Sequence, residues 1–184
     1  MNNATSSSPY ELLLQTARQA IEQYLQGDAL NVPALDDSLN QTRGVFVTLW
    51  ESPKKLRGCI GRTQGITPTL SQEVAECAIL AATRDPRFQP ISKIEQVQAL
   101  KIELSLLMQL EPIDDSGLLD PHRYGVVVSA GNRRGLLLPN VDGVDTVEEQ
   151  LKIACQKGKI ERNENFELAR FEVLKICDQD TSES

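Results

Sequence analysis

The segment Leu56–Gly61 combines a cysteine with an arginine two positions before it and a glycine on either side. In an extended chain the side chains alternate between two faces, so the spacing predicts Arg57, Cys59 and Gly61 on one face, with the apolar residues on the other. An arginine beside a thiol favours the thiolate, which is the form that acts as a nucleophile or ligand. The pattern therefore predicts a reactive or ligand-contacting Cys59.

A second interpretation of the same segment is structural. Free cysteine is among the most buried residue types, and a single cysteine in a strand is commonly a small apolar side chain in the core. Gly58 and Gly61 weaken a strand unless another backbone must approach closely or the chain must bend. We therefore expect substitution at either glycine to be poorly tolerated under both interpretations.

Asp85-Pro86-Arg87-Phe88 follows a segment of small residues at helical spacing, and Pro86 prevents that helix from continuing. One interpretation is a loop that stops the helix, with an Asp–Arg pair on the surface and Phe88 in the core. The other is a clamp beside Cys59, in which Arg87 offers a bidentate fork to a carboxylate or phosphate. Glu103, on the polar face of a later strand, is a candidate general base if that face lines a cleft.

The candidate site thus has Cys59 as its catalytic residue and a set of surrounding residues that would bind substrate. These substrate-binding candidates are Arg57, Gly58, Gly61, Asp85, Arg87 and Glu103. We predict that Arg57, Cys59, Asp85 and Arg87 converge in one cleft.

Several classes of function are excluded by what the sequence lacks. The four cysteines are scattered and His122 is the only histidine, so no metal site is expected at any usual ligand spacing. No P-loop or dinucleotide-binding glycine pattern is present, and no cofactor is implied. A net charge of −7 disfavours nucleic acid and anionic membranes as partners. Free thiols and the lack of a signal or membrane-spanning pattern lead us to expect a cytoplasmic protein.

The elements that position these residues can be predicted from local patterns. Ser8, Pro9 and Glu11 form a capping-box start for a helix over residues 9–26. Period-two patterns and turn residues predict a β-hairpin across residues 44–61, a long strand over 100–110 and another strand over 167–177. Further predicted elements are a helix after Pro68, a hairpin around Gly131-Asn132 and a helix that begins at Thr146 and is terminated by Gly158. Antiparallel hairpins among a few helices predict an α+β fold.

Taken together, four segments resemble the AMMECR domain family in content and order. These are Leu56–Gly61, Ala81 to Phe88, Gly135-Leu136-Leu137-Leu138-Pro139 and Cys155-Gln156-Lys157. The family is named for a human gene in the Alport syndrome, midface hypoplasia and elliptocytosis region and has many prokaryotic members. The resemblance covers residues 9–177, which we expect to form one domain between a disordered N-terminal segment (1–8) and a disordered polar tail (178–184).

The resemblance implies an α+β fold with mixed, largely antiparallel sheets and two unequal subdomains that have a cleft between them. It does not supply a reaction. It does imply a pathway shared with a Memo-like protein and a radical-SAM enzyme. Two functions stay open at this point: an enzyme or enzyme component that binds a small anionic or carbonyl-containing metabolite around Cys59, and a non-catalytic adaptor in which the same residues are structural.

Overall fold

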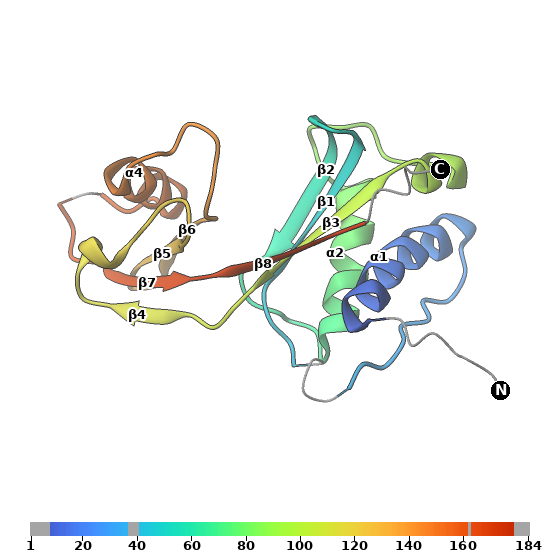
Figure 1. Cartoon of the computed structure of the whole chain (residues 1–184), viewed down its shortest axis with the longest axis horizontal. Coiled ribbons are helices and arrows are strands. Elements are labelled where there is room, and N and C mark those ends of the chain that lie inside the picture. Colours follow the sequence, from blue (N-terminus) through green and yellow to red (C-terminus); the bar gives the residue numbers. More distant parts are fainter. Residues whose placement is uncertain (1–7, 37–40, 162, 179–184) are drawn as a thin grey trace. The chain divides into compact units, whose positions relative to one another are not determined.

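The computed structural model describes residues 8–36, 41–161 and 163–178. These residues form an α+β fold with four α-helices, one short 3-10 helix (Ser116–Leu118) and two antiparallel four-stranded sheets (Figure 1). The chain divides into two compact units, one built from residues up to Leu106 and from Lys175 on, the other from Leu107–Leu174. The predicted α+β class is confirmed, while the cleft between subdomains stays a prediction.

The first helix has the predicted bounds. α1 spans Pro9–Gln26, begins with a complete capping box between Ser8 and Glu11, and ends at Gly27, whose φ of 75° is the left-handed conformation that glycine adopts most easily. Ser8, which was predicted to belong to a disordered N-terminal segment, is the N-cap of α1, and residues 1–7 lie outside the described residues.

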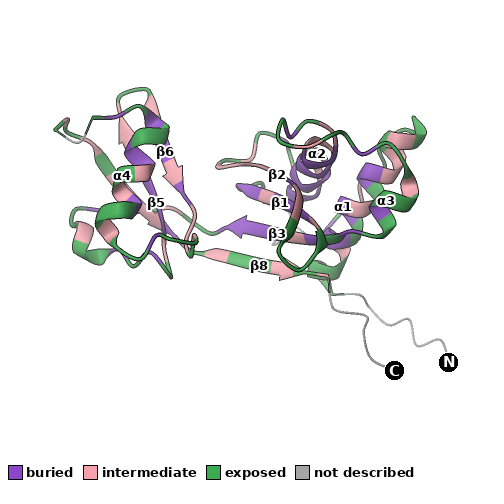
Figure 2. Ribbon diagram, turned by 90° about the horizontal axis from the view of Figure 1, so that it is seen from above, coloured by how far each residue is buried: buried purple, intermediate pink, exposed green. Residues whose placement is uncertain are grey.

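The first unit holds the sheet that carries the candidate site. Its strand order is β2-β1-β3-β8, with β1 at Val45–Ser52, β2 at Lys55–Arg62, β3 at Lys101–Leu107 and β8 at Val173–Cys177. The largely buried helix α2 (Leu70–Thr83) packs on β1 and β2 and also contacts α1 (Figure 2).

The core of the first unit lies on the helix-covered face of this sheet. Val47 and Leu49 of β1 are fully buried in it, so Thr48 between them points to the opposite face. Gly58 faces α2, where a Cβ would lie 2.2 Å from the carbonyl oxygen of Ala81. At Gly61 a Cβ would lie 2.4 Å from a ring carbon of Phe46. The two glycines are thus required by close packing.

The pairing of β1 with β2 contains an irregularity that the alternation rule did not predict. Leu49 lies opposite Gly58 and Trp50 lies opposite Leu56, so Arg57 has no partner in that register. Such a bulge bends the strand and redirects the side chain of the extra residue. Strict alternation, which would place Arg57 beside Cys59, therefore does not hold at Arg57.

The second unit has its own sheet and core. The strand order is β4-β7-β5-β6, with β4 at Glu111–Ile113, β5 at Gly125–Ala130, β6 at Arg133–Leu137 and β7 at Glu167–Phe171. α4 (Val147–Gly158) begins with the predicted capping box at Thr146 and packs on β5 and β6.

The end of α4 differs from the prediction in one residue. Gly158 is the last helical residue, and Lys159 takes the left-handed conformation with φ of 52°. Gly158 is needed for packing, because a Cβ there would lie 2.7 Å from the backbone nitrogen of Gly135. The turn prediction at Gly131 is confirmed by its φ of 59°.

Two strand predictions were wrong in extent. The segment 167–177 forms two strands, β7 and β8, which belong to different sheets. The strand predicted over residues 100–110 ends at Leu107, after which the Met108 N–H donates to the carbonyl of Glu172. The short helix α3 (Ile94–Gln98) and β4 were not predicted. At the C-terminus, Asp178 is described and residues 179–184 of the predicted tail lie outside the described residues.

Candidate active site around Cys59

Cys59 lies in the middle of β2, on the sheet face turned away from α2. Its sulfur is 3.2 Å from the hydroxyl oxygen of Thr48, which is its cross-strand partner on β1. The Cys59 residue is half-buried, whereas Cys77 and Cys155 are buried in the two cores. Cys59 is therefore more exposed than either of these two thiols, and it lies beside a hydroxyl group.

Asp85 and Arg87 reach Cys59 through its peptide groups. The Cys59 N–H donates to Asp85 Oδ2 at 2.9 Å, and Arg87 Nη2 donates to the Cys59 carbonyl at 3.4 Å. Because β2 is an edge strand, these groups would otherwise have no strand to pair with. The Asp–Arg pair therefore occupies the position of a neighbouring strand and fixes the backbone at Cys59.

The fork of Arg87 is directed at Asp85. Nε and Nη2 donate to the two carboxylate oxygens at 2.9 and 2.7 Å, and the Arg87 N–H donates to Oδ1 at 3.1 Å. The Asp85 side chain is only 2% exposed, while Arg87 is 55% exposed and lies over the Phe88 ring. The predicted Asp–Arg pair forms, but Asp85 is buried rather than on the surface, and Phe88 is half-buried rather than part of the core. Because the fork of Arg87 is engaged by Asp85, its binding of a ligand stays a prediction.

The electrostatics of this pair are strong. The Arg87 guanidinium holds the pKa of Asp85 well below its ordinary value; burial opposes this effect, and the N–H groups of Cys59 and Arg87 add to it. In turn Asp85 raises the pKa of Arg87. Asp85 is therefore a fixed carboxylate at neutral pH and has no proton to transfer.

Arg57 is directed away from the thiol. Its Nη2 donates to the carbonyl of Gln89 at 2.6 Å, and its Nε lies 3.4 Å from Glu51. The Arg57 side chain is 12% exposed, and its Nη1 is buried with no hydrogen-bond partner in the described parts of the chain. One cationic donor close to Cys59 along β2 is thus left unsatisfied.

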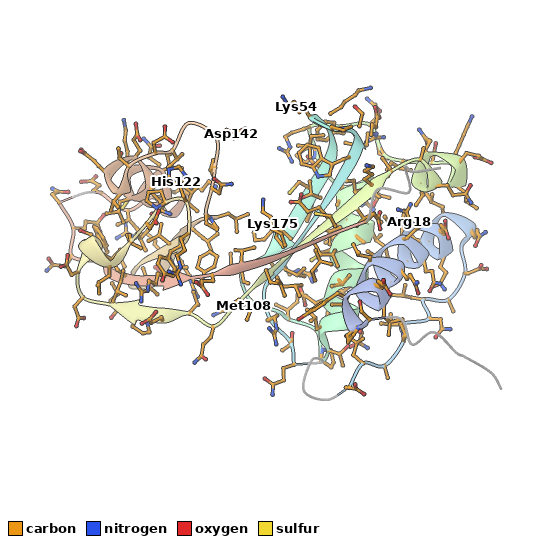
Figure 3. The ribbon with its side chains drawn as sticks, in the orientation of Figure 1. Arg18, Lys54, Met108, His122, Asp142 and Lys175 are labelled. Atoms are coloured by element: carbon orange, nitrogen blue, oxygen red, sulfur yellow. The ribbon has the colours of Figure 1, made fainter. Side chains whose placement is uncertain are left out.

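Glu103 belongs to the same row of the sheet as Cys59. In register, Thr48 of β1 lies opposite Cys59 on one side and opposite Glu103 on the other. Glu103 also lies 3.7 Å from the ammonium of Lys175 and 3.8 Å from the sulfur of Cys177, both on β8 (Lys175 is labelled in Figure 3). The row therefore runs thiol, hydroxyl, carboxylate, thiol across four strands.

The structure thus brings the predicted residues to one sheet and its edge, with different contacts for each. Asp85 and Arg87 contact the peptide groups of Cys59, Glu103 lies two strands away, and Arg57 turns aside. Thr48 was missed by sequence reasoning. The hairpin between residues 44 and 61 already implied that a residue of β1 faces Cys59, so pairing the two strands in register would have found it.

The described residues also bear on metal binding and on membrane insertion. There, no group of three or more His, Cys, Asp or Glu side chains is arranged to hold a metal ion. None of the helices in that part of the chain combines the length and the apolar character needed to cross a bilayer. His122 in the second unit lies 3.7 Å from Asp145, and both side chains are exposed.

Comparison with known proteins places this geometry in context. The family model described as AMMECR1 matches residues 14–176. A protein from Thermotoga maritima is 43% identical, with 85% of this chain and 92% of that protein covered. A Clostridium acetobutylicum protein is 39% identical over 88% of this chain, which spans only 35% of that protein. The crystal structure of an uncharacterised Pyrococcus horikoshii protein has a TM-score of 0.76 and 34% identity, covering 90% of this chain and 89% of that one.

Proposed function

This chain belongs to the AMMECR1 family, and we propose that its Cys59 face binds a small metabolite bearing an anionic group or a carbonyl, as an enzyme or enzyme component. The observation that carries the proposal is the 3.2 Å contact between the Cys59 sulfur and the Thr48 hydroxyl. This contact lies on a strand whose backbone Asp85 holds in place. A nucleophile needs such fixed geometry and a nearby group that can relay its proton.

We propose an anionic group on the ligand because the guanidinium of Arg87 is 55% exposed and its Nη2 lies 3.4 Å from the Cys59 carbonyl. Arg57 adds positive charge from β2, although its own side chain turns away from the thiol. A carboxylate on the ligand is the acceptor that a guanidinium prefers.

A carbonyl group on the ligand is proposed because a thiol adds readily to one. In this addition the Cys59 sulfur forms a bond to the carbonyl carbon, and the π electron pair of the C=O bond moves to oxygen. The thiol proton is transferred to that oxygen through the Thr48 hydroxyl. Atoms and charge balance without an oxidant or a metal. The role proposed for Glu103 is to accept a hydrogen bond or proton further along the same row.

The second candidate is the adaptor, and one observation favours it. Asp85 and Arg87 satisfy the peptide groups of an edge strand, which is a sufficient structural reason for both residues. In that case Cys59 packs against Thr48, and another surface contacts a partner protein. The proposed partners, a Memo-like protein and a radical-SAM enzyme, rest on the resemblance and suit either candidate.

Protection from alkylation separates the two candidates. We expect pyruvate, a small 2-oxo acid with both a carbonyl and a carboxylate, to slow iodoacetamide labelling of Cys59 severalfold in the native protein, as measured by peptide mass spectrometry. Cys177 is the internal control, because it is exposed and lies on a different strand.

Arg57→Ala is the test variant and Lys55→Ala is its matched control, since each removes one cation from β2. Protection should be lost in the first and retained in the second. Equal labelling of Cys59 with and without glyoxylate, pyruvate and 2-oxoglutarate would favour the adaptor.

A further inference from the structure

A separate cavity lies in the second unit, on the face of its sheet turned away from α4. Val126 and Val128 of β5 belong to the buried core that includes Ala154 of α4, so Val127 between them points to the opposite face. Val127 lines the cavity, whose volume is about 650 Å³ and whose lining residues all lie within Leu107–Leu174. We propose that this cavity binds a short apolar peptide, a dipeptide with free termini. The inference goes beyond the proposed function and uses no residue of the Cys59 face.

The apolar part of the ligand is inferred from the floor of the cavity. Ala169 of β7 lies opposite Val127 on one side and opposite Pro112 of β4 on the other, so their side chains form one apolar row across three strands (labelled in Figure 1). Phe166, just before β7, adds an aromatic side chain to the lining. Aliphatic side chains of a peptide would remove this row from water.

Two carboxylates lie at one end of the cavity. The pairing of β4 with β7 ends where Ile113 lies opposite Leu168, and the next residues on the two segments are Asp114 and Glu167. Both are exposed and line the cavity, and neither has an ion pair with any other residue that the structure describes. Neighbouring like charges repel, and an ammonium group between them relieves the repulsion. The N-terminus of a peptide supplies such a group.

The other end of the cavity carries a cation. Ser129 of β5 lies opposite Glu167 on one side and opposite Arg134 of β6 on the other, so these polar side chains form a second row on the same face. Arg134 is exposed, lines the cavity and has no ion pair within the described parts of the chain. Its guanidinium can therefore bind the C-terminal carboxylate of the peptide.

The spacing of these charges sets the length of the ligand. Arg134 lies two strand spacings from Glu167 and three from Asp114, which corresponds to about 10 and 14 Å between Cα atoms. An extended dipeptide spans about 7 Å and, with a hydrogen bond of about 3 Å at each end, bridges about 13 Å. A single amino acid is about 3.5 Å shorter and falls below both separations.

Calorimetric titration of the whole chain with alanyl-leucine tests the proposal, and we expect saturable binding at one site. N-acetylation removes the ammonium group and C-terminal amidation removes the carboxylate, so each should weaken binding about fivefold, the upper end for an exposed ion pair. Glycyl-glycine, which lacks apolar side chains, should bind at least about fivefold more weakly. Free leucine that binds as tightly as alanyl-leucine would overturn the proposal.

Variants at the two ends test the orientation of the peptide. Arg134→Gln should bind alanyl-leucine and its amide equally, and Asp114→Asn combined with Glu167→Gln should bind alanyl-leucine and its N-acetyl derivative equally. Arg123→Gln is the matched control, since Arg123 is an exposed arginine of the same unit that does not line the cavity; it should keep the affinity and both preferences of the parent. Absence of saturable binding to the parent, a preference for the free carboxylate that persists in Arg134→Gln, or equal weakening by Arg123→Gln and Arg134→Gln would each overturn the proposal.

Discussion

Replacing Glu73 by alanine is expected to lower the free energy of unfolding by about 3–5 kcal/mol, the range for removing one partner of a buried ion pair. Glu73 is fully buried in α2. One of its oxygens accepts from Arg62 Nη1 at 2.7 Å, and the other accepts from the N–H of Ile66 at 2.8 Å and from the N–H and hydroxyl of Thr67. The substitution leaves the N–H groups of Ile66 and Thr67 without their acceptor and removes the buried partner of Arg62, which then keeps only the exposed Glu76.

The charge state of Glu73 supports this size of effect. Burial raises its pKa, but the bond from Arg62 and the donors on Thr67 and Ile66 outweigh burial, so that the pKa lies below its ordinary value. Glu73 therefore stays ionised and anchors the loop between β2 and α2.

Urea unfolding of Glu73→Ala beside Glu76→Ala would measure the effect. Glu76 binds the same nitrogen of Arg62 at 3.0 Å, but its side chain is 45% exposed, so its loss should cost about 0–1 kcal/mol. Equal losses in the two variants would show that the Glu73 network is not what holds the loop.

The second large effect is expected at Asp85. Asp85→Asn removes the negative charge that pairs with Arg87 and weakens the acceptor of the Cys59 N–H, and we expect a loss of about 2–3 kcal/mol in unfolding free energy. Asp120→Asn is the matched control, because Asp120 also precedes a proline and accepts from the N–H two residues later, at 3.0 Å, but in an exposed loop. That control should change the free energy by about 0.5 kcal/mol or less.

The pH dependence of stability has a definite sign for Asp85. Its pKa is lowered in the folded protein, so below about pH 4 the unfolded chain takes up the proton first. The contribution of Asp85 to stability is fully present above the unfolded pKa and is lost as the pH falls through the folded pKa. Unfolding free energies measured from pH 7 down to pH 3 should therefore fall less steeply in Asp85→Asn than in the parent. Parallel curves would contradict the pairing.

The fold was predictable from sequence wherever its signals are local. α1 begins and ends as predicted because Ser8, Glu11 and Gly27 determine its ends through hydrogen bonds and a backbone angle within one turn. The segment 167–177 was predicted as one strand because alternation does not reveal which sheet a strand joins. Its first half, Glu167–Phe171, pairs with β5 residues that lie 38 to 46 positions away in sequence, and its second half, β8, lies beside β3.

The proximity of Asp85 and Arg87 to Cys59 was predictable from the sequence, but the contacts were not, and the roles of these residues in a site stay predictions. The order of residues indicated that Asp85 and Arg87 belong near Cys59. That they bind its peptide groups follows from β2 being an edge strand, which is a property of the whole sheet. The direction of Arg57 depends on a bulge that no local pattern in the segment announces. Thr48 lies between two buried apolar residues, and only the register of the hairpin gives it a role.

The most direct test of the central claim is the rate of alkylation of Cys59 at neutral pH in the native parent and in Thr48→Val. Valine keeps the shape of threonine and removes the hydroxyl that lies 3.2 Å from the sulfur. Cys77 is buried, and that burial is the main reason why its pKa is raised to about 12. Its alkylation rate therefore gives the lower limit of reactivity. Cys177, whose pKa is raised by partial burial and by Glu103, is the exposed reference.

A Cys59 poised for chemistry should be labelled faster than Cys177 in the parent and several times more slowly in Thr48→Val, with labelling of Cys177 unchanged. If Cys59 is instead labelled as slowly as Cys77, and equally in both proteins, the thiol is part of the packing and the claim of a reactive site around it is contradicted.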